Sequence, residues 1–332
     1  MAKPPPVTAK RIDQALKTEA YRIHPFSKQD LSRQRVKNLL HFWDIQQIGF
    51  HTYISPRSYL ELKEATPKKP FNILGLDPMT FPRIPSSSTH WLAKDTHGNI
   101  LAYRYCLRDP DGTLLSKLAS SAKELPPSSK TPKAEATQGQ FTVHHYAAWI
   151  PLYRTEPSMS AEYRNEMPHS RQFLQQNQKL FEKLSMDFRA IDPVMYAKYT
   201  RMQQHLPEDV RALGGAWLGV AINLGQDDLI GVNTHTDWND KKYGFNCVLP
   251  FGDYTGAAII LWQLEVILEL LPGDVLFFMG GIIAHNTEKV ASGVRNSIDL
   301  FSHEKVFNWV KKEKMEKGKM ENKKRKMDQL LE

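Results

Sequence analysis

Short runs of strand-forming residues separated by tight-turn residues fill the chain from Gly214 to about residue 280. The runs are 216–224, 244–250, 257–264, 266–270 and 275–279. The breaks after the second, fourth and fifth runs are rich in Gly, Pro and Asp, at 252–256, 272–274 and 280–281. These residue types supply the backbone angles of turns. Several short strands with close turns predict an all-β sandwich or barrel for this part of the chain.

Helical patterns flank the β-rich stretch, so the predicted fold class is α+β. Ser170 is placed to cap a segment whose apolar residues, from Phe173 to Phe188, recur at helical spacing. Asp192-Pro193 has the N-cap and first-residue signature of a further helix. After Phe301 the sequence becomes helical again and basic.

Composition divides the chain into a basic N-terminal segment, an N-terminal part, a core and a basic helical tail. Their ranges, in that order, are 1–40, 41–140, 141–305 and 306–332. The first segment is charged, contains Pro4-Pro5-Pro6, and is expected to be flexible. The core is expected to combine the β-rich stretch with the helices that precede it.

The N-terminal part contains one predicted hairpin and one predicted flexible insert. Two short apolar runs, 91–95 and 100–105, flank the turn sequence Thr96-His97-Gly98-Asn99. Five prolines between 66 and 90 favour irregular extended chain. Residues 108–140 are rich in Ser, Lys and Pro and are expected to form the insert.

Overall composition excludes several classes of protein. The chain has 332 residues, of which 41% are hydrophobic and 24% charged. These ordinary globular values argue against collagen-like, fully disordered and membrane-embedded chains. No apolar run approaches the length of about 18 residues that a membrane helix needs, and no secretory signal is expected at the N-terminus. Two cysteines, Cys106 and Cys247, make no disulfide framework and suit a reducing compartment.

Positive charge is concentrated at both ends of the chain. The formal net charge is +8, yet residues 1–37 and 311–326 each hold nine Lys and Arg against three acidic residues. Basic ends around a near-neutral body suit an approach to a polyanion such as a nucleic acid. A solvated tail, or a nuclear-import signal at Lys323-Lys324-Arg325-Lys326, would explain the tail equally well.

The main candidate for chemistry is His235-Thr236-Asp237. Residues i and i+2 of extended chain point to the same side, so both side chains can reach one metal ion. In this composition one such triplet arises readily by chance. His285 follows 48 residues after Asp237, beyond turns that could fold it back. Two His and one carboxylate leave three positions open, as in oxygen-activating Fe(II) sites, although Zn²⁺ is not excluded by these ligand types.

Arg295 is the candidate anchor for an anionic co-substrate. It follows His285 by ten residues, and Ser297 lies on the same side of the predicted strand. A guanidinium group matches a carboxylate with two hydrogen bonds. A surface ion pair is the alternative role of this arginine.

The stretch from about Gly214 to His303 resembles the core of the 2-oxoglutarate/Fe(II)-dependent dioxygenases, and more narrowly the TET/JBP family, particularly its fungal members. The residues that carry the resemblance are His235-Thr236-Asp237-Trp238-Asn239-Asp240, the segments 249–256 and 272–278, His285 and Arg295. The resemblance implies a double-stranded β-helix, or jelly roll, with flanking helices. It also implies that His235, Asp237 and His285 hold Fe(II), and that Arg295 binds 2-oxoglutarate with Ser297 and Asn223 nearby.

The resemblance further implies a methylated base in DNA as the substrate. Asp240 and His303 match the positions at which the family reads the target base. The implied reaction uses O2 and 2-oxoglutarate to oxidise 5-methylcytosine to 5-hydroxymethylcytosine and further products, or to demethylate 6-methyladenine. The base must leave the duplex to reach the iron. A nuclear location, no membrane and no obligate protein partner are expected.

Two other functions remain open from the residues alone. The first is a 2-oxoglutarate oxygenase that acts on a protein or a small molecule. The second is a nucleic-acid-binding module without turnover. Among other polar and aromatic candidates, His144-His145 cannot easily share one metal because neighbours on a strand face opposite sides. Cys247 is expected to be a buried hydrophobe, and Trp238 to line the pocket or pack outside it.

Overall fold

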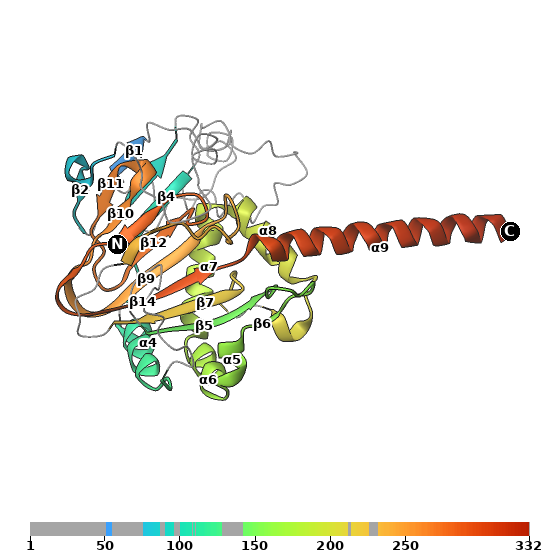
Figure 1. Ribbon diagram of the computed structural model, residues 1–332, viewed down its shortest axis with the longest axis horizontal. Coiled ribbons are helices and arrows are strands. Elements are labelled where there is room, and N and C mark those ends of the chain that lie inside the picture. The colour runs from blue at the N-terminus through green and yellow to red at the C-terminus, as the bar shows by residue number, and fades with distance from the viewer. Residues whose placement is uncertain are drawn as a thin grey trace, which may run out of the picture.

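Two β-sheets carry the core of the protein (Figure 1). The computed structural model describes residues 51–54, 76–86, 90–95, 100–107, 109, 111–127, 142–211, 214–225 and 232–331. The larger sheet runs in the order β1 (His51–Ile54), β3 (Trp91–Lys94), β4 (Ile100–Cys106), β12 (Asp274–Phe278), β9 (Asn246–Gly256), β14 (Val290–Phe301), β7 (Gly219–Leu224), β5 (Thr142–Trp149) and β6 (Ser158–Met159). The smaller sheet runs in the order β2 (Arg83–Ile84), β11 (Val266–Leu268), β10 (Ile259–Leu261), β13 (His285–Thr287) and β8 (Val232–His235).

Pairing within the sheets is antiparallel apart from the β1–β3 and β2–β11 pairs. The two sheets form a double-stranded β-helix, so the predicted α+β jelly-roll fold is confirmed. The predicted hairpin is also confirmed, because β3 pairs with β4. Its turn, residues 96–99, lies outside the described residues, as does the basic segment 1–40.

One predicted turn is wrong. Residues 252–256 do not reverse the chain but continue β9, where Gly252 pairs with Arg295 and Gly256 with Val290 of β14. Both glycines have left-handed backbone angles, with φ of 110° and 79°. Glycine adopts such angles without strain, and here that freedom bends and twists a long strand. Part of the predicted run 257–264 differs too, because Trp262–Leu264 forms a 3₁₀ helix after β10.

Helices pack on one face of the larger sheet, and a last helix leaves the body of the protein (Figure 1). They are α4 (Thr113–Lys123), α5 (Ala161–Asn165), α6 (His169–Gln176), α7 (Gln178–Ile191), α8 (Pro193–Gln203) and α9 (Glu304–Leu331). Short 3₁₀ helices occur at Pro78–Thr80 and Glu208–Val210. None of the described helices has the length and apolar character needed to cross a bilayer.

The helical segment predicted to begin at Ser170 is two helices, and Ser170 is not its cap. It lies inside α6, where its hydroxyl donates to the carbonyl oxygen of Tyr163. Asn177 separates α6 from α7, and its buried side chain donates to the carbonyl oxygen of Phe173. The predicted start of α8 is confirmed, since the Asp192 side chain accepts from the Met195 backbone N–H at 2.8 Å.

The expectation of a flexible insert over 108–140 is wrong for its first half. Residues 113–123 form α4, which begins where the Asp109 carboxylate accepts from two backbone N–H groups. Leu118 and Ala122 of α4 are buried against the rest of the protein. The sequence pattern misleads because Ser116 and Ser120, on the exposed side of an amphipathic helix, resemble a linker. Residues 128–141 lie outside the described residues.

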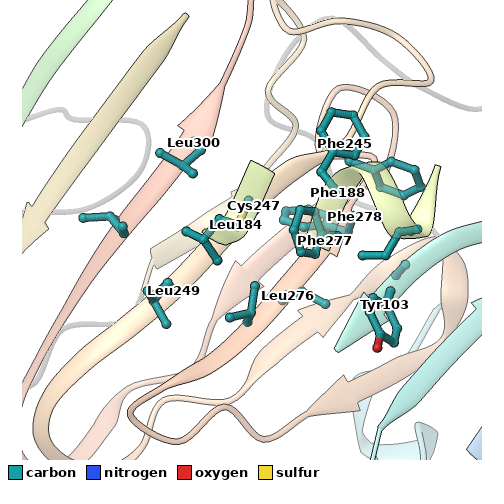
Figure 2. Close-up of a cluster of buried hydrophobic side chains, with 14 of the residues drawn as sticks. Tyr103, Leu184, Phe188, Phe245, Cys247, Leu249, Leu276, Phe277, Phe278 and Leu300 are labelled. Atoms are coloured by element: carbon teal, nitrogen blue, oxygen red, sulfur yellow. The ribbon is translucent and has the colours of Figure 1, made fainter. Parts of the chain in front are cut away.

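A layer of buried side chains joins α7 to the larger sheet (Figure 2). Leu184 and Phe188 of α7 lie against Cys247 and Leu249 of β9, with Leu300 of β14 in the same cluster. Cys247 is fully buried, as predicted. Because side chains alternate along a strand, the residues between these core positions face the other side of the sheet, toward the smaller sheet.

Candidate metal centre and active site

Three potential metal ligands meet between the two sheets. His235 ends β8 and His285 begins β13, and the two are directly paired across these antiparallel strands. Asp237 follows β8 by two residues. Its Oδ1 lies 3.7 Å from Nε2 of His235, and its Oδ2 lies 3.7 Å from Nε2 of His285. The three ligand atoms all lie within 4.8 Å of one another. The structure thus brings together the side chains that the sequence selected.

The orientation of each imidazole suits metal binding. Nδ1 of His235 donates to the carbonyl oxygen of Asn233 at 2.7 Å, and Nδ1 of His285 donates to that of Ile283 at 2.9 Å. A carbonyl oxygen only accepts, so Nδ1 of each ring carries a proton and Nε2 faces the shared point. Burial, together with the neighbouring His235, lowers the pKa of His285 to about 4. His285 is therefore neutral at pH 7, the form that binds metal ions.

Asp237 is held by its own surroundings. Its backbone N–H donates to the Gly280 carbonyl oxygen at 2.9 Å, and its Oδ2 accepts from Nδ2 of Asn246 at 2.9 Å. A Cβ atom on Gly280 would lie 2.8 Å from the same Oδ2. Residue 280 must therefore be small for the carboxylate to keep its place. Asn246, which the sequence did not indicate, fixes the rotamer of the carboxylate.

Arg295 lies on β14 of the facing sheet and lines the same cavity. Its guanidinium carbon is 5.9 Å from the centre of the Tyr254 ring. Its Nε is buried and has no hydrogen-bond partner among the described residues. A buried N–H without an acceptor is costly, so this group suits an anionic ligand that enters the cavity.

Asn223 and Ser297 lie side by side next to Arg295, as the sequence suggested. They are directly paired on β7 and β14, and Nδ2 of Asn223 donates to Oγ of Ser297 at 3.1 Å. The same Nδ2 donates to Oδ2 of Asp299 at 2.6 Å. Burial raises the pKa of Asp299 to about 6, against the opposing effect of Arg295. Asp299 lines the cavity and was not predicted.

Asp240 and His303 meet at another part of the same cavity. Oδ1 of Asp240 is 3.5 Å from Nε2 of His303, and its Oδ2 accepts from Nδ2 of Asn246 at 2.7 Å. Burial, with a contribution from the Asp237 charge, raises the pKa of Asp240 well above its usual value. Burial lowers the pKa of His303 to about 4. The pair therefore offers a neutral imidazole and a desolvated carboxyl group.

An aromatic wall adjoins His303, and the sequence did not reveal it. The Trp149 ring stacks on the His303 ring, with centroids 5.3 Å apart and planes 8° apart. The ring centroids of Phe301 and His303 are 5.4 Å apart, and those of His145 and Trp149 are 6.0 Å apart. His144 and His145 do face opposite sides of β5, as expected: His144 contacts the buried Glu166, while His145 lines the cavity.

These groups surround one cavity of about 350 Å³, a size usual for sites that bind small molecules. Trp238 lies at its margin and is 50% exposed. The donor set of two imidazoles and one carboxylate, with no fourth protein ligand among the described residues, suits Fe(II) with open positions. A structural Zn²⁺ site would usually be closed by a fourth ligand.

Comparisons with known proteins give likenesses of fold. Neither a family model nor a curated protein sequence matches the chain. A solved structure, "NgTET1 in complex with 5mC DNA", is similar over 83% of this chain and 92% of its own, with 14% identity and a TM-score of 0.56. A 2OG-Fe(II) oxygenase family protein from Burkholderia pseudomallei covers 56% of this chain and 76% of its own, with 15% identity and a TM-score of 0.37.

A prolyl-4-hydroxylase from Pseudomonas putida matches with a TM-score of 0.35 and 13% identity, over 60% of this chain and 91% of its own. Of these three, NgTET1 has a TM-score above 0.5. The chain therefore has the double-stranded β-helix fold of NgTET1.

Proposed function

We propose that this protein is a 2-oxoglutarate- and Fe(II)-dependent dioxygenase that oxidises the methyl group of a methylated base in DNA. The observation that carries the proposal is the convergence of His235, Asp237 and His285 opposite Arg295 in one cavity. His235, Asp237 and His285 would hold the metal ion, and Arg295 would hold a carboxylate. The fold shared with NgTET1 supports it.

The residues have separate roles in the proposed reaction. His235, Asp237 and His285 hold Fe(II), and Arg295 holds the distal carboxylate of 2-oxoglutarate, with Ser297 and Asn223 beside it. When bound, iron, 2-oxoglutarate and O2 supply the oxidant. The methyl group, the keto acid and O2 yield a hydroxymethyl group, succinate and CO2. The protein positions the groups and keeps water from the buried part of the cavity.

A flat heteroaromatic base suits the remainder of the cavity. Phe301 and the stacked Trp149–His303 pair form a surface for π-stacking. Asp240 is placed to accept from an exocyclic amine, and neutral His303 can contact the base edge. We take 5-methylcytosine as the first substrate because the likeness of fold is to a protein solved with 5mC DNA. Hydroxylation of the N-methyl group of 6-methyladenine would release formaldehyde by the same chemistry.

DNA as the carrier of the base is supported by α9. The helix begins directly after His303, next to the cavity, and residues 311–326 give it nine Lys and Arg against three Glu. Flipping a base out of the duplex costs a few kcal/mol. Phosphate contacts by the lysines offset part of that free energy and should weaken with salt. Action on nuclear DNA, and hence a nuclear location, is part of the proposal.

The test is a product assay. Protein is incubated with Fe(II), ascorbate and 2-oxoglutarate and with duplexes that carry 5-methylcytosine, 6-methyladenine or no methyl group. Nucleosides and succinate are measured by mass spectrometry. We expect a methylated duplex to yield one succinate for each oxidation step that its product base records. No oxidised base from the 5-methylcytosine duplex, together with no conversion of 6-methyladenine to adenine, would overturn the proposed substrate. Activity on peptides or metabolites instead would redirect it.

Two variants distinguish catalysis from binding. His235→Ala should lose bound iron and turnover while the circular dichroism spectrum is unchanged. His169→Ala removes an exposed histidine at the start of α6 and should keep both. Iron content is read by elemental analysis. A His235→Ala protein that keeps iron and activity would contradict the assigned metal site.

A further inference from the structure

The part of the cavity proposed to contact the base, here called the base end, is built from two segments that are far apart in the sequence. One is residues 237–242, which follow β8 and carry Asp240; the other is residues 302–304, which lead from β14 into α9 and carry His303. Asp240 and His303 face each other in an isolated antiparallel bridge, with Oδ1 of the first 3.5 Å from Nε2 of the second. The contact between the two segments therefore sets the relative position of these side chains.

The backbone contributes two hydrogen bonds to this contact. The N–H of Lys241 donates to the Ser302 carbonyl oxygen at 2.8 Å, and the N–H of Glu304 donates to the Asn239 carbonyl oxygen at 2.9 Å. Paired strands of ordinary length have a longer ladder of such bonds. Side chains that join the two segments therefore contribute strongly to how firmly the bridge is held.

Glu304, the first residue of α9, provides such a side chain. Both oxygens of its carboxylate accept from Nζ of Lys241 at 2.9 Å, and its Oε2 also accepts from the backbone N–H of Lys242 at 2.8 Å. The side chains of Lys241 and Glu304 are 18% and 27% exposed, so water screens the ion pair only in part. Nζ of Lys241 also lies 5.5 Å from the centre of the Phe307 ring, on the same face of α9.

The contacts of Glu304 indicate a role beyond the stability of α9. Negative charge near a helix N-terminus is favourable in any case. An acceptor that served the helix alone would bond the free N–H groups of the first turn. Among the described residues, however, the Glu304 carboxylate accepts from Lys241 and Lys242 and from no backbone group of α9.

The metal end of the cavity has separate supports. The backbone N–H of Asp237 donates to the Gly280 carbonyl oxygen, and its Oδ2 accepts from Asn246. Neither bond involves Glu304, and Glu304 is not among the residues that line the cavity. Loss of its carboxylate should therefore loosen residues 240–242 and leave Asp237 in place.

Building on the function proposed above, we propose that Glu304 is a positioning residue, whose carboxylate holds residues 240–242 so that Asp240 stays opposite His303 at the base end. Asn246 restrains the carboxyl group of Asp240, and Glu304 restrains the backbone next to it. Glu304 touches neither the metal site nor the base, and no bond is made or broken at it. It affects the choice of base through Asp240, from the first residue of the basic helix.

The test is a double-mutant cycle between Glu304 and Asp240. Wild type, Glu304→Ala, Asp240→Ala and the double variant are assayed on the methylated duplex that wild type oxidises faster. If Glu304 acts through Asp240, the effect of removing Glu304 disappears once the Asp240 side chain is absent. We expect Glu304→Ala to lower kcat/KM about tenfold in the wild-type background and less than about twofold in the Asp240→Ala background.

Binding to iron-free protein repeats the cycle without turnover. Fluorescence anisotropy compares the methylated duplex with a duplex that has an abasic site at the same position, where there is no base for Asp240 to contact. Glu304→Ala should lose affinity for the methylated duplex relative to the abasic one. Iron content, and the affinity of the iron-loaded protein for 2-oxoglutarate in anaerobic titration calorimetry, should be unchanged because both depend on the metal end.

Two further variants give a rescue and a control. Glu304→Gln keeps an acceptor for the Lys242 N–H but loses the charge that faces Lys241, so it should retain more activity than Glu304→Ala. Asn308→Ala changes an exposed residue one turn farther along α9 and should match wild type in every measurement. If Glu304→Ala does not fold, as judged by circular dichroism, Glu304→Gln takes its place in the cycle.

The outcomes separate this inference from the proposed function. Wild-type protein that oxidises no methylated base would overturn both. Wild-type turnover of a methylated duplex would keep the function, and the role of Glu304 alone would be overturned if its removal had no effect or an equal effect in both backgrounds. Loss of iron or of 2-oxoglutarate affinity in Glu304→Ala would also overturn it, because the effect would then lie at the metal end.

Discussion

Asn246 and His303 show how single side chains arrange the site. The Asn246 amide donates to Asp237 and to Asp240, so one group ties the metal-facing carboxylate to the base-facing one. His303 stacks on Trp149, and its pKa is lowered to about 4 by burial. A ring that stays neutral well below pH 6 can lie against a flat ligand without a charge to desolvate.

That lowered pKa predicts a pH-dependent stability. In the unfolded chain His303 binds a proton below about pH 6.5. In the folded protein it binds one only below about pH 4. Stability is therefore lost as the pH falls through this window. We compare the two proteins without iron. The unfolding free energy of wild type minus that of His303→Phe should fall by up to about 3 kcal/mol from pH 7 to pH 4. Urea unfolding measures it; a difference independent of pH would contradict the assignment.

Sequence reasoning reached the residues whose spacing is local and missed those brought in by tertiary pairing. His235 and Asp237 are two residues apart, and the fold sets His285 opposite them. Trp149 comes from β5, far earlier in the chain, and nothing near it in the sequence points to a cavity. Asp299 carried a usable signal, because strand alternation puts it on the same face as Arg295.

Among the elements, α9 is unusual because most of it lies away from the body (Figure 1). Val306 and Val310 in its first turns are buried against Met202, Leu206 and Leu218. Beyond them the sequence is dominated by Lys and Glu. A helix of 28 residues is about 42 Å long, comparable to a full turn of duplex DNA.

Deleting residues 311–332 should weaken binding to any DNA duplex, mainly at low salt. The deletion keeps Val306 and Val310, so the fold should be retained. The plot of log K against log salt concentration should become shallower by about 0.9 for each phosphate that the shortened protein no longer neutralises. As the converse control, Glu313→Gln, Glu316→Gln and Glu321→Gln together should strengthen binding. A slope unchanged by the deletion would remove α9 from the DNA-binding surface.

Element prediction failed where one residue type permits two structures. Gly252 and Gly256 allow a turn, yet here they bend β9 because β14 pairs with the whole length of that strand. The serines of 113–123 resemble a linker, yet burial of Leu118 makes the segment a helix. In both cases long-range packing decided between locally acceptable conformations.

At the scale of the whole molecule, Phe188 joins the helical layer to the sheet that carries the site (Figure 2). Its ring stacks on that of Trp217, with centroids 5.1 Å apart. The centroid of the Phe277 ring of β12 is 6.2 Å away. Phe278, the next residue of β12, contacts the His285 ring, and the two ring centroids are 4.7 Å apart. One strand thus separates the core contact from the metal centre.

Phe188→Ala should lower the free energy of unfolding by about 3–5 kcal/mol, because it opens a cavity in a closely packed cluster. Met186→Ala on the same helix is the control, since Met186 is 52% exposed and should change stability by less than about 0.5 kcal/mol. Chemical denaturation gives both values. A loss of less than about 1 kcal/mol at position 188 would mean that the helical layer contributes little to the fold.

The alternation along β14 constrains how the protein can change over evolutionary time. Arg295, Ser297 and Asp299 point one way while Ile298 and Leu300 point the other, and both edges of the strand are paired. Insertion or deletion of one residue in this stretch would turn the cavity-facing residues beyond it toward the core, and the core-facing residues toward the cavity. Evolution can therefore change the cavity-facing side chains of β14 by substitution but not by insertion or deletion.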